Sequence, residues 1–430
     1  MKRPVSVLVL ATLVLAACGG DDDDDSASTA GSETAATESA DTETAGTEAA
    51  STSAGSAGTE AAGTDAAGEL FVIGAAVAQT GGFELYDNEV LAGVRRGIEE
   101  VNAAGGAGGR MLELIISDHG TDVARVESAA LDVIEQGAEL VVVTADYDFG
   151  AQAGIAAGNA GVLAMGGAGA AEFGFEGIGP LFFNVYPGNP TEAAVITEWA
   201  YNTQGWRNPI LLADTSIEYS KEVCELFDAR WTELAGADSI VGRETFVNSD
   251  PSIAAQVSAI RDSEADVLVL CSYPPGGASA IRQIRTGGID LPIQGVAAYD
   301  GTFWLEAIPD LSDFYHPAMA SAAGDDANPD VNALFAAVPP AGGGIYVLFG
   351  YLIVETLARA LEITNGSGNG EELASAIETF ADEPLLVGPT TYSDTCHVPI
   401  GRQMAMMEIQ NGAPSLIEYI TPESLPVNTC

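Results

Sequence analysis

Short apolar runs and amphipathic stretches alternate along the chain from Glu69 onward. Runs bounded by turn residues are typical of buried strands, whereas apolar residues three and four apart predict helices. The first series predicts strands at 70–74, 111–117, 140–144 and 162–165, and helices at 88–102, 123–136 and 151–160. This alternation indicates an α/β fold in which helices cover parallel sheets.

A second series of the same kind starts after the apolar run 181–185 and predicts a second, similar lobe, although no close internal repeat is present. Its strands are expected at 209–213, 240–246, 267–271 and 292–295, and its helices at 191–201, 218–234, 253–261 and 279–285. Open parallel sheets bind ligands beyond the carboxyl ends of their strands. Those ends lead here into the loops 76–86, 145–149, 166–170, 215–219, 272–275 and 296–300.

The apolar segment 345–361 contains Tyr351, Glu355 and Arg359, which predicts a buried amphipathic helix rather than a membrane span. The start of the chain differs from the rest. Lys2 and Arg3 precede a short apolar run that ends in Leu-Ala-Ala-Cys at 15–18.

That ending resembles the lipobox of bacterial lipoproteins, which implies a signal peptide at 1–17 and a lipid on the thiol of Cys18. The alternative is an ordinary signal peptide with an incidental cysteine. Residues 18–67 are almost entirely Ala, Gly, Ser, Thr, Asp and Glu, so they cannot bury a core. We expect an extended acidic tether that holds the body away from the membrane.

Charge narrows the choice of partners. The formal net charge is −47, and the residues after the tether include 50 acids against 13 bases. Such a surface repels phosphate backbones, so nucleic acid is not an expected partner. The excess of acid indicates solubility, including at high salt; an acidic pocket for a cationic ligand is the alternative.

Catalytic and metal-binding patterns are missing from the sequence. It contains neither Gly-x-Ser-x-Gly nor a phosphate-binding Gly-Lys-Ser/Thr loop, and Gly166–Gly169 lacks the third glycine of a dinucleotide site. The histidines, His119, His316 and His397, are far apart, and we expect each to be a surface or loop residue. No cofactor and no metal are predicted, and a binding protein is favoured over an enzyme.

Four cysteines besides Cys18 are available for disulfides in an exported chain. Cys396 with Cys430 would pin the C-terminus, and Cys224 with Cys271 would join a helix to a strand of the second lobe. The spacing leaves three connectivities open.

One motif points to a known family. Residues 99–106 read Glu-Glu-Val-Asn-Ala-Ala-Gly-Gly and are followed by Gly109-Arg110 and a strand. This resembles the EINAAGG…GR motif of type I periplasmic solute-binding proteins of ABC importers, in the leucine/isoleucine/valine-binding branch. Segments in the same order and spacing lie at 79–82, 161–163, 281–288 and 387–389. The likeness runs from about Glu69 to the C-terminus.

The resemblance implies two Rossmann-like lobes with parallel central sheets, joined by a three-strand hinge. The first lobe would comprise 69–188 and 318–385, and the second 189–317 and 386–430. A solute would be held between the lobes, and the closed form would be presented to the membrane permease. The protein would act as a monomer, lipid-anchored on the extracytoplasmic face of the membrane.

The resemblance also implies a set of ligand-binding residues. They are Tyr86, Tyr147, Asp148, Ala168, Ala170, Tyr219, Ser272, Tyr273, Tyr299 and Asp300. The hydroxyls with which amino-acid binders hold the carboxylate are missing at Tyr147 and Ala170. The acid that takes the α-ammonium group aligns with Ala297, so Asp300 would have to stand in. An amide, a polyol or a cationic solute therefore fits at least as well as leucine.

Three functions follow from these observations. The leading one is the solute receptor of an ABC importer for an amino acid, an amide or a related small polar compound. The second is a lipoprotein that reports its ligand to a membrane partner, and the third is an exported enzyme on a related scaffold. The missing nucleophile and metal patterns disfavour the third.

Overall fold

The computed structural model describes residues 69–170 and 175–426. The predicted signal peptide, Cys18, the tether up to residue 67 and Cys430 lie outside the described residues. Within the described part, no helix combines the length and apolarity needed to cross a bilayer.

The first sheet has five parallel strands in the order β2-β1-β3-β4-β5. Their bounds are β1 (Leu70–Val77), β2 (Met111–Asp118), β3 (Leu140–Val143), β4 (Leu163–Gly166) and β5 (Phe182–Asn184). Every residue of β3, β4 and β5 is buried, because helices cover both faces of the sheet. That double burial explains the continuous apolar runs in the sequence.

The second sheet has the order β14-β13-β10-β9-β8-β6-β7. Its strands are β6 (Pro209–Asp214), β7 (Gly242–Phe246), β8 (Val267–Cys271), β9 (Ile293–Gly295), β10 (Phe314–Ala318), β13 (Met404–Gln410) and β14 (Ala413–Ile420). Strands β7-β6-β8-β9-β10 are parallel and repeat the order of the first sheet. The predicted α/β architecture with parallel central sheets in two lobes is confirmed, and β13 and β14 extend the second sheet in antiparallel fashion.

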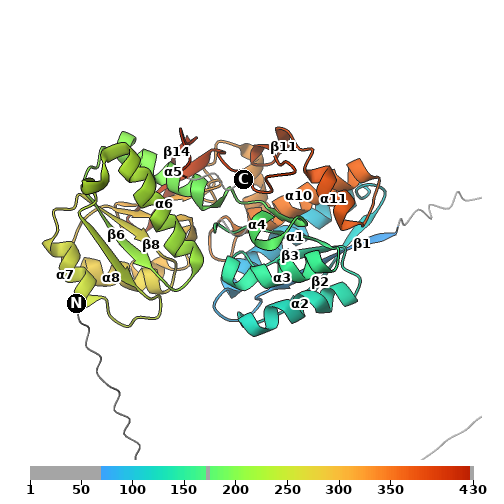
Figure 1. Ribbon diagram of the computed structural model, residues 1–430, viewed down its shortest axis with the longest axis horizontal. Coiled ribbons are helices and arrows are strands. Elements are labelled where there is room, and N and C mark those ends of the chain that lie inside the picture. Colours follow the sequence, from blue (N-terminus) through green and yellow to red (C-terminus); the bar gives the residue numbers. More distant parts are fainter. Residues whose placement is uncertain (1–68, 171–174, 427–430) are drawn as a thin grey trace, which may run out of the picture. The chain divides into compact units, whose positions relative to one another are not determined.

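Helices connect and cover these strands. They are α1 (Glu84–Ala103), α2 (Val123–Glu135), α3 (Tyr147–Asn159), α4 (Phe175–Ile178), α5 (Gly188–Glu198), α6 (Glu218–Ala235), α7 (Ala254–Asp262), α8 (Gly276–Thr286), α9 (Pro329–Ala337), α10 (Tyr346–Thr364) and α11 (Gly370–Ile377). Helices α2 and α3 lie side by side over one face of the first sheet (Figure 1). A short hairpin of β11 (Glu383–Leu385) and β12 (Gly388–Thr390) follows α11. As predicted, the segment around 345–361 is a largely buried helix, α10.

Two glycines let α1 and α10 approach closely. A Cβ atom on Gly93 would lie 1.9 Å from the carbonyl oxygen of Val347, and one on Gly350 would lie 1.8 Å from that of Val90. Real Cβ atoms do not come this close to backbone oxygens. Any side chain at either position would push the two helices apart.

Helix α5 is buried along its whole length, so its acidic residues need internal partners. Glu198 accepts hydrogen bonds from Arg230 at 3.0 and 2.7 Å, and both side chains are nearly inaccessible to solvent. Helix α6 is tied to β8 by a disulfide between Cys224 and Cys271, whose Cα atoms are 5.6 Å apart. A cross-link of this span restricts the unfolded chain and so stabilises the second lobe.

Three sequence expectations need correction. Helices α1 and α3 begin earlier than predicted, which places Tyr86, Tyr147 and Asp148 in first helical turns rather than in loops. Of the histidines expected at the surface or in loops, His119 and His397 lie in loops but are buried, and His316 is buried within β10. Burial lowers the pKa of all three, and that of His316 to about 4.

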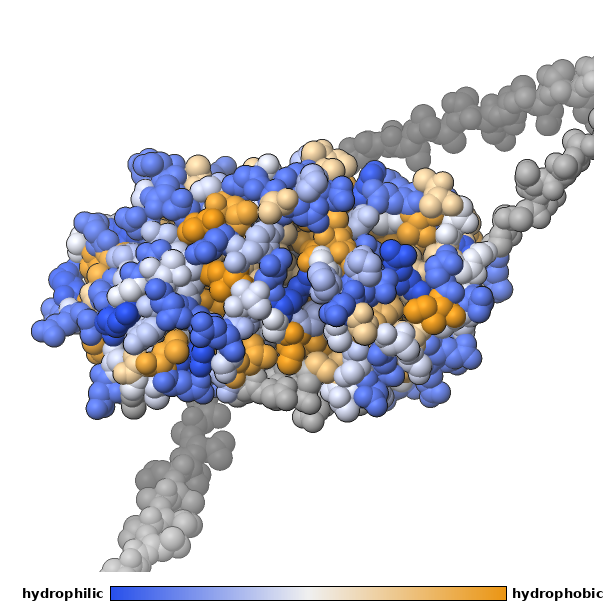
Figure 2. All heavy atoms as spheres, turned by 90° about the horizontal axis from the view of Figure 1, so that it is seen from above, coloured by the Kyte–Doolittle hydropathy of each residue, from blue (hydrophilic) through white to orange (hydrophobic). Residues whose placement is uncertain are grey.

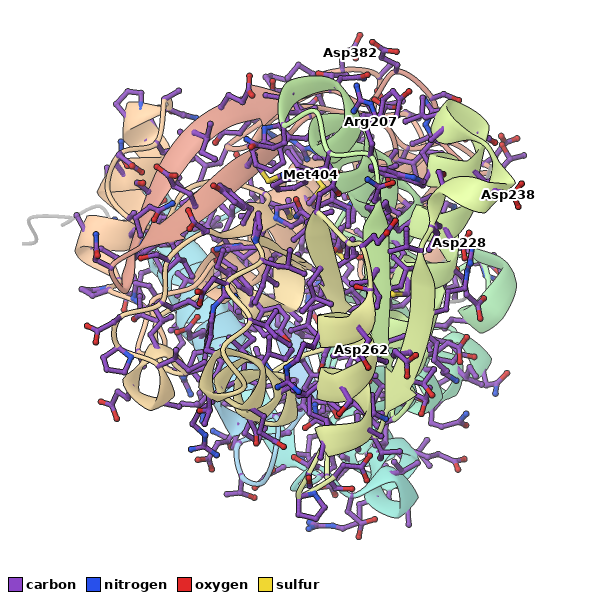
Figure 3. All side chains as sticks on the ribbon, turned by 90° about the vertical axis from the view of Figure 1, so that its left-hand side faces the viewer. Arg207, Asp228, Asp238, Asp262, Asp382 and Met404 are labelled. Carbon is purple, nitrogen blue, oxygen red and sulfur yellow. A yellow bond between two sulfur atoms is a disulfide. The ribbon has the colours of Figure 1, made fainter. Side chains whose placement is uncertain are left out.

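The surface of the body is dominated by polar residues. Figure 2 shows hydrophilic residues over much of one face, with hydrophobic residues in scattered patches. The side chains of Asp238 and Asp382 point outward at the rim of the view in Figure 3, and both are exposed. Among the described residues, many of the acidic side chains are therefore exposed to solvent.

Candidate functional site

A narrow cavity lies where the loops of the two sheets meet. Its lining residues are Phe83, Tyr86, Ala145, Asp146, Gly167, Ala168, Gly169, Tyr186, Ile217, Tyr219, Tyr273, Ala297, Ala298, Ile345, Tyr346 and Phe349. All six loops expected from the strand ends contribute to this lining.

The location follows from the strand order. Each sheet reverses its order between its first and third strands, at β1/β3 in one lobe and at β6/β8 in the other. Loops on either side of such a reversal diverge and leave a crevice beyond the carboxyl ends of the strands. The cavity is lined from both crevices, with the first turn of α10 adding to the wall.

Seven of the sixteen lining residues are aromatic. The ring of Tyr86 lies 4.8 Å from that of Tyr346, in an edge-to-face arrangement. The ring of Phe83, which precedes α1, lies 6.2 Å from that of Tyr273 in the other lobe. Contacts of this kind hold the rings in fixed orientations.

Asp146 contributes a carboxylate to the cavity. It follows β3 as the N-cap residue of α3 and is only 4% exposed. Its Oδ1 atom has no hydrogen-bond partner among the described residues, and the same is true of the Tyr86 hydroxyl. Burial, together with the charge of Asp148, raises the pKa of Asp146 to about 7.

A second carboxylate, Glu192 of α5, lies behind the wall. Its oxygens accept hydrogen bonds from the hydroxyls of Tyr186 at 2.7 Å and Tyr219 at 2.9 Å, and from the N–H of Ala297 at 2.8 Å. Burial nevertheless raises its pKa. Glu192 thus fixes two cavity tyrosines and the start of the loop after β9.

Asp87 positions the Asp146 loop from the opposite side. Its carboxylate accepts hydrogen bonds from the N–H of Ala78 at 2.7 Å and from the hydroxyl of Thr144 at 2.6 Å. It therefore ties α1 to the ends of β1 and β3. Burial raises its pKa to about 6.

The glycine-rich loop after β4 forms a tight part of the wall. A Cβ on Gly169 would lie 2.1 Å from Oδ1 of Asn189 and 2.5 Å from the ring of Tyr219. The N–H and C=O of the preceding residue, Ala168, are both hydrogen-bonded to the side chain of Asn184. This loop offers a close-fitting surface with few polar groups of its own.

Four of the ten residues expected at the site line the cavity: Tyr86, Ala168, Tyr219 and Tyr273. Tyr147 instead packs against the apolar cluster shared by α2 and α3. Ala170 is buried outside the lining, and Ser272 donates a hydrogen bond to Asp214 at 2.8 Å.

The remaining three expected residues lie nearby. The Asp148 carboxylate is exposed and accepts a hydrogen bond at 2.9 Å from the N–H of Glu218, which links the lobes. Tyr299 packs between Trp304 and Phe314. Asp300 is buried beside the cavity, and its carboxylate accepts a hydrogen bond from the N–H of Ile345 at 2.7 Å. Burial raises its pKa to about 8.

Sequence reasoning missed several of the lining residues. Asp146 carried a usable signal, since an aspartate just before a helix is a preferred N-cap. Tyr346 and Phe349 carried none, because only the packing of α10 brings them to the loops of both sheets. In the described part of the chain, no group of three or more Asp, Glu, His or Cys side chains is arranged to hold a metal ion.

Comparisons with known proteins agree with this architecture. Residues 71–414 match the family described as "Periplasmic binding protein". The chain is 24% identical over 334 residues to the Leu/Ile/Val-binding protein BraC3 of Rhizobium johnstonii, covering 75% of this chain and 87% of that protein.

Among solved structures, a branched-chain amino acid binding protein of Streptococcus pneumoniae in complex with isoleucine aligns with a TM-score of 0.70 and 22% identity, over 82% of this chain and 100% of that one. A solute-binding protein of Rhodopseudomonas palustris in complex with 3,4-dihydroxybenzoic acid aligns with a TM-score of 0.68 and 17% identity, over 83% of this chain and 99% of that one. The chain therefore belongs to the periplasmic binding protein family.

Proposed function

We propose that this protein is the extracytoplasmic solute receptor of an ABC importer and binds a small polar solute in the cavity between its lobes. The observation that carries the proposal is the cavity itself, which is lined by the strand-end loops of both sheets. Relatives named as Leu/Ile/Val-binding proteins, and neighbours solved with isoleucine or an aromatic acid, support a small organic solute.

Binding would be coupled to closure of the lobes about a hinge formed by the three chain crossings. The lobes would comprise 69–188 with 318–385, and 189–317 with 386–430. Contacts that join the lobes support this proposal, namely those of Asp148 with Glu218 and of Asp300 with Ile345. A solute that touches both walls favours the arrangement in which these contacts exist.

A ligand screen tests the receptor function. Full-length protein, purified in detergent, is mixed with amino acids, amides, polyamines, sugars and aromatic acids, and thermal unfolding is followed. One class should raise the Tm, because a ligand that binds only the folded form stabilises it by mass action. Small-angle scattering with that ligand should show a smaller radius of gyration. A broad panel with no effect on Tm argues against a receptor.

The anchor is a separate proposal, supported by the lipobox-like ending at Cys18 and the acidic stretch that follows it. Replacing this residue, Cys18→Ser, should move the protein from the membrane fraction to the soluble fraction. Unchanged membrane association of the variant contradicts the lipid anchor. Besides the lipid bilayer that holds the anchor, the protein would contact the permease of the importer.

A further inference from the structure

The cavity contains a carboxylate for which the protein supplies no positive partner. Asp146 is buried and lines the cavity, and its Oδ1 has no hydrogen-bond partner among the described residues. None of the described lining residues is Arg, Lys or His, and the sequence of the undescribed stretch 171–174 contains no basic residue. Only the backbone N–H groups of Asp148 and Phe149, at the start of α3, stabilise its ionised form. A buried carboxylate without a cationic partner is either neutralised by a proton or paired with a cation from outside the protein.

The wall around this carboxylate is suited to a cation. Seven aromatic residues line the cavity: Phe83, Tyr86, Tyr186, Tyr219, Tyr273, Tyr346 and Phe349. The faces of aromatic rings attract ammonium groups, and the attraction strengthens where water is excluded. The hydroxyls of Tyr186 and Tyr219 donate to Glu192, which leaves these rings more electron-rich.

Other charge classes fit less well. An amino acid or an aromatic acid would bring a carboxylate into a cavity that has Asp146 in its wall, Glu192 behind it and no basic side chain among its described residues. The backbone atoms of Ala168 are already bonded to Asn184 and are not free to replace such a side chain. Like charges at short range in a poorly solvated site repel strongly.

We propose that the cavity selects an organic cation, a small amine or quaternary ammonium compound, whose charge lies between Asp146 and the aromatic wall. The inference rests on the proposed receptor function and assigns the charge class of its solute. The unpartnered hydroxyl of Tyr86 is placed to bond a polar substituent of the same solute.

Matched pairs of probes isolate the charge. Choline is compared with 3,3-dimethyl-1-butanol, which has the same shape without the charge, and benzylamine with benzyl alcohol; leucine and benzoate complete the set. Affinities for the full-length protein are measured by calorimetry. We expect the charged member of at least one pair to bind tenfold or more tightly than its neutral partner, and more tightly than leucine or benzoate.

Failure of this inference is distinguishable from failure of the receptor function. Binding of leucine, benzoate or a neutral probe at least as tightly as its charged counterpart overturns the charge class and leaves the receptor function standing. If none of the six compounds binds, the charge class is overturned as well, and the receptor function is then decided by the broad screen.

Two variants test whether the preference for the charged probe depends on the side chain of Asp146. Asp146→Asn keeps the shape and an N-capping side chain, so the fold should survive, and the charged-to-neutral affinity ratio should fall to near one. Asp310→Asn is the control: it removes an exposed carboxylate that does not line the cavity, and the ratio should persist. A ratio that survives Asp146→Asn overturns the proposal.

Choline carries a permanent charge, so its pH dependence reports on the protein. Because burial raises the pKa of Asp146 to about 7, its ionised fraction, and with it the choline affinity, should rise about thirtyfold between pH 5.5 and 8. Asp148, Asp87, Tyr86 and Tyr273 are the other titratable groups near this carboxylate. Asp87, with a pKa of about 6, titrates in the same range, and Asp146→Asn supplies the reference curve. A flat wild-type profile contradicts the proposal.

Discussion

Several carboxyl groups at and beside the cavity hold protons more tightly than they would in water. Burial raises the pKa of Asp87 to about 6, those of Glu89 and Asp146 to about 7, and that of Asp300 to about 8. Near neutral pH the folded chain therefore binds more protons at these sites than the unfolded chain does. Stability is greatest when these groups are protonated and is lost as the pH rises toward 8.

Replacement of Asp300 by Asn tests this linkage at one residue. The side-chain amide oxygen of the asparagine can still accept a hydrogen bond from the N–H of Ile345, while the buried charge is removed. We expect the Tm of Asp300→Asn to exceed that of the wild type by a few degrees at pH 8.5 and to match it at pH 5. Differential scanning fluorimetry across this range is the measurement.

The other groups facing Asp300 do not reverse this expectation. His316 lies 3.8 Å away with its pKa lowered to about 4 by burial, so it stays neutral, and Glu89 acts only to raise the pKa of Asp300. The exposed residue Asp310 supplies a control, since Asp310→Asn should not reproduce the pH-dependent gain. An Asp300→Asn variant that is less stable than wild type at both pH values contradicts the linkage.

For single residues, the sequence predicted which loops line the cavity better than it predicted which side chains point into it. Tyr86, Tyr219 and Tyr273 were placed at the cavity by resemblance, and the structure brings them together. Asp300 was expected to touch solute, but the structure turns its carboxylate to the start of α10. Which way a loop side chain points depends on partners that are distant in sequence, and no local pattern records them.

At the scale of elements, the contact of α1 with α10 depends on two glycines. Gly350→Ala should lower the free energy of unfolding by about 2 kcal/mol or more, because its methyl group would meet the carbonyl of Val90. Gly158→Ala is the matched control, since that helical glycine faces open space and alanine is the better helix former. Urea denaturation should show the first variant destabilised and the second slightly stabilised. Equal midpoints would show that α10 can shift without penalty.

The strand–helix alternation predicted most elements of both sheets. It did not predict β13 and β14, although the sequence carried their signal. The two strands are joined by Asn411-Gly412, both with positive φ, which is the favoured two-residue hairpin turn. Strand β10 and helices α9 and α11 were also missed, because their short apolar runs lie among glycine- and proline-rich segments.

At the scale of the whole molecule, the acidic excess should make stability depend on salt. Self-repulsion among surface carboxylates opposes folding and is screened by ions. We expect the Tm to rise with added NaCl, most steeply below about 0.5 M, where the screening length changes most. Scanning calorimetry from 0 to 2 M NaCl is the measurement. A Tm that is flat or falls over the first 0.5 M contradicts the expectation.

Two lobes and a ligand site between strand-end loops could be predicted from the alternation and the family motif, because both follow from local sequence. The chemistry of the cavity could not. It depends on Glu192, Tyr219 and Tyr346, which come from three separate parts of the chain and meet only through tertiary packing.

The pairing of α1 with α10, and of β10 with β13, also bears on biogenesis. More than 250 residues separate Gly93 from Val347, and β13 begins only at Met404. Neither lobe can seal its core until the ribosome has made almost the whole polypeptide. A nascent chain of this design stays loosely folded during synthesis, which is the condition a translocation channel requires of its cargo.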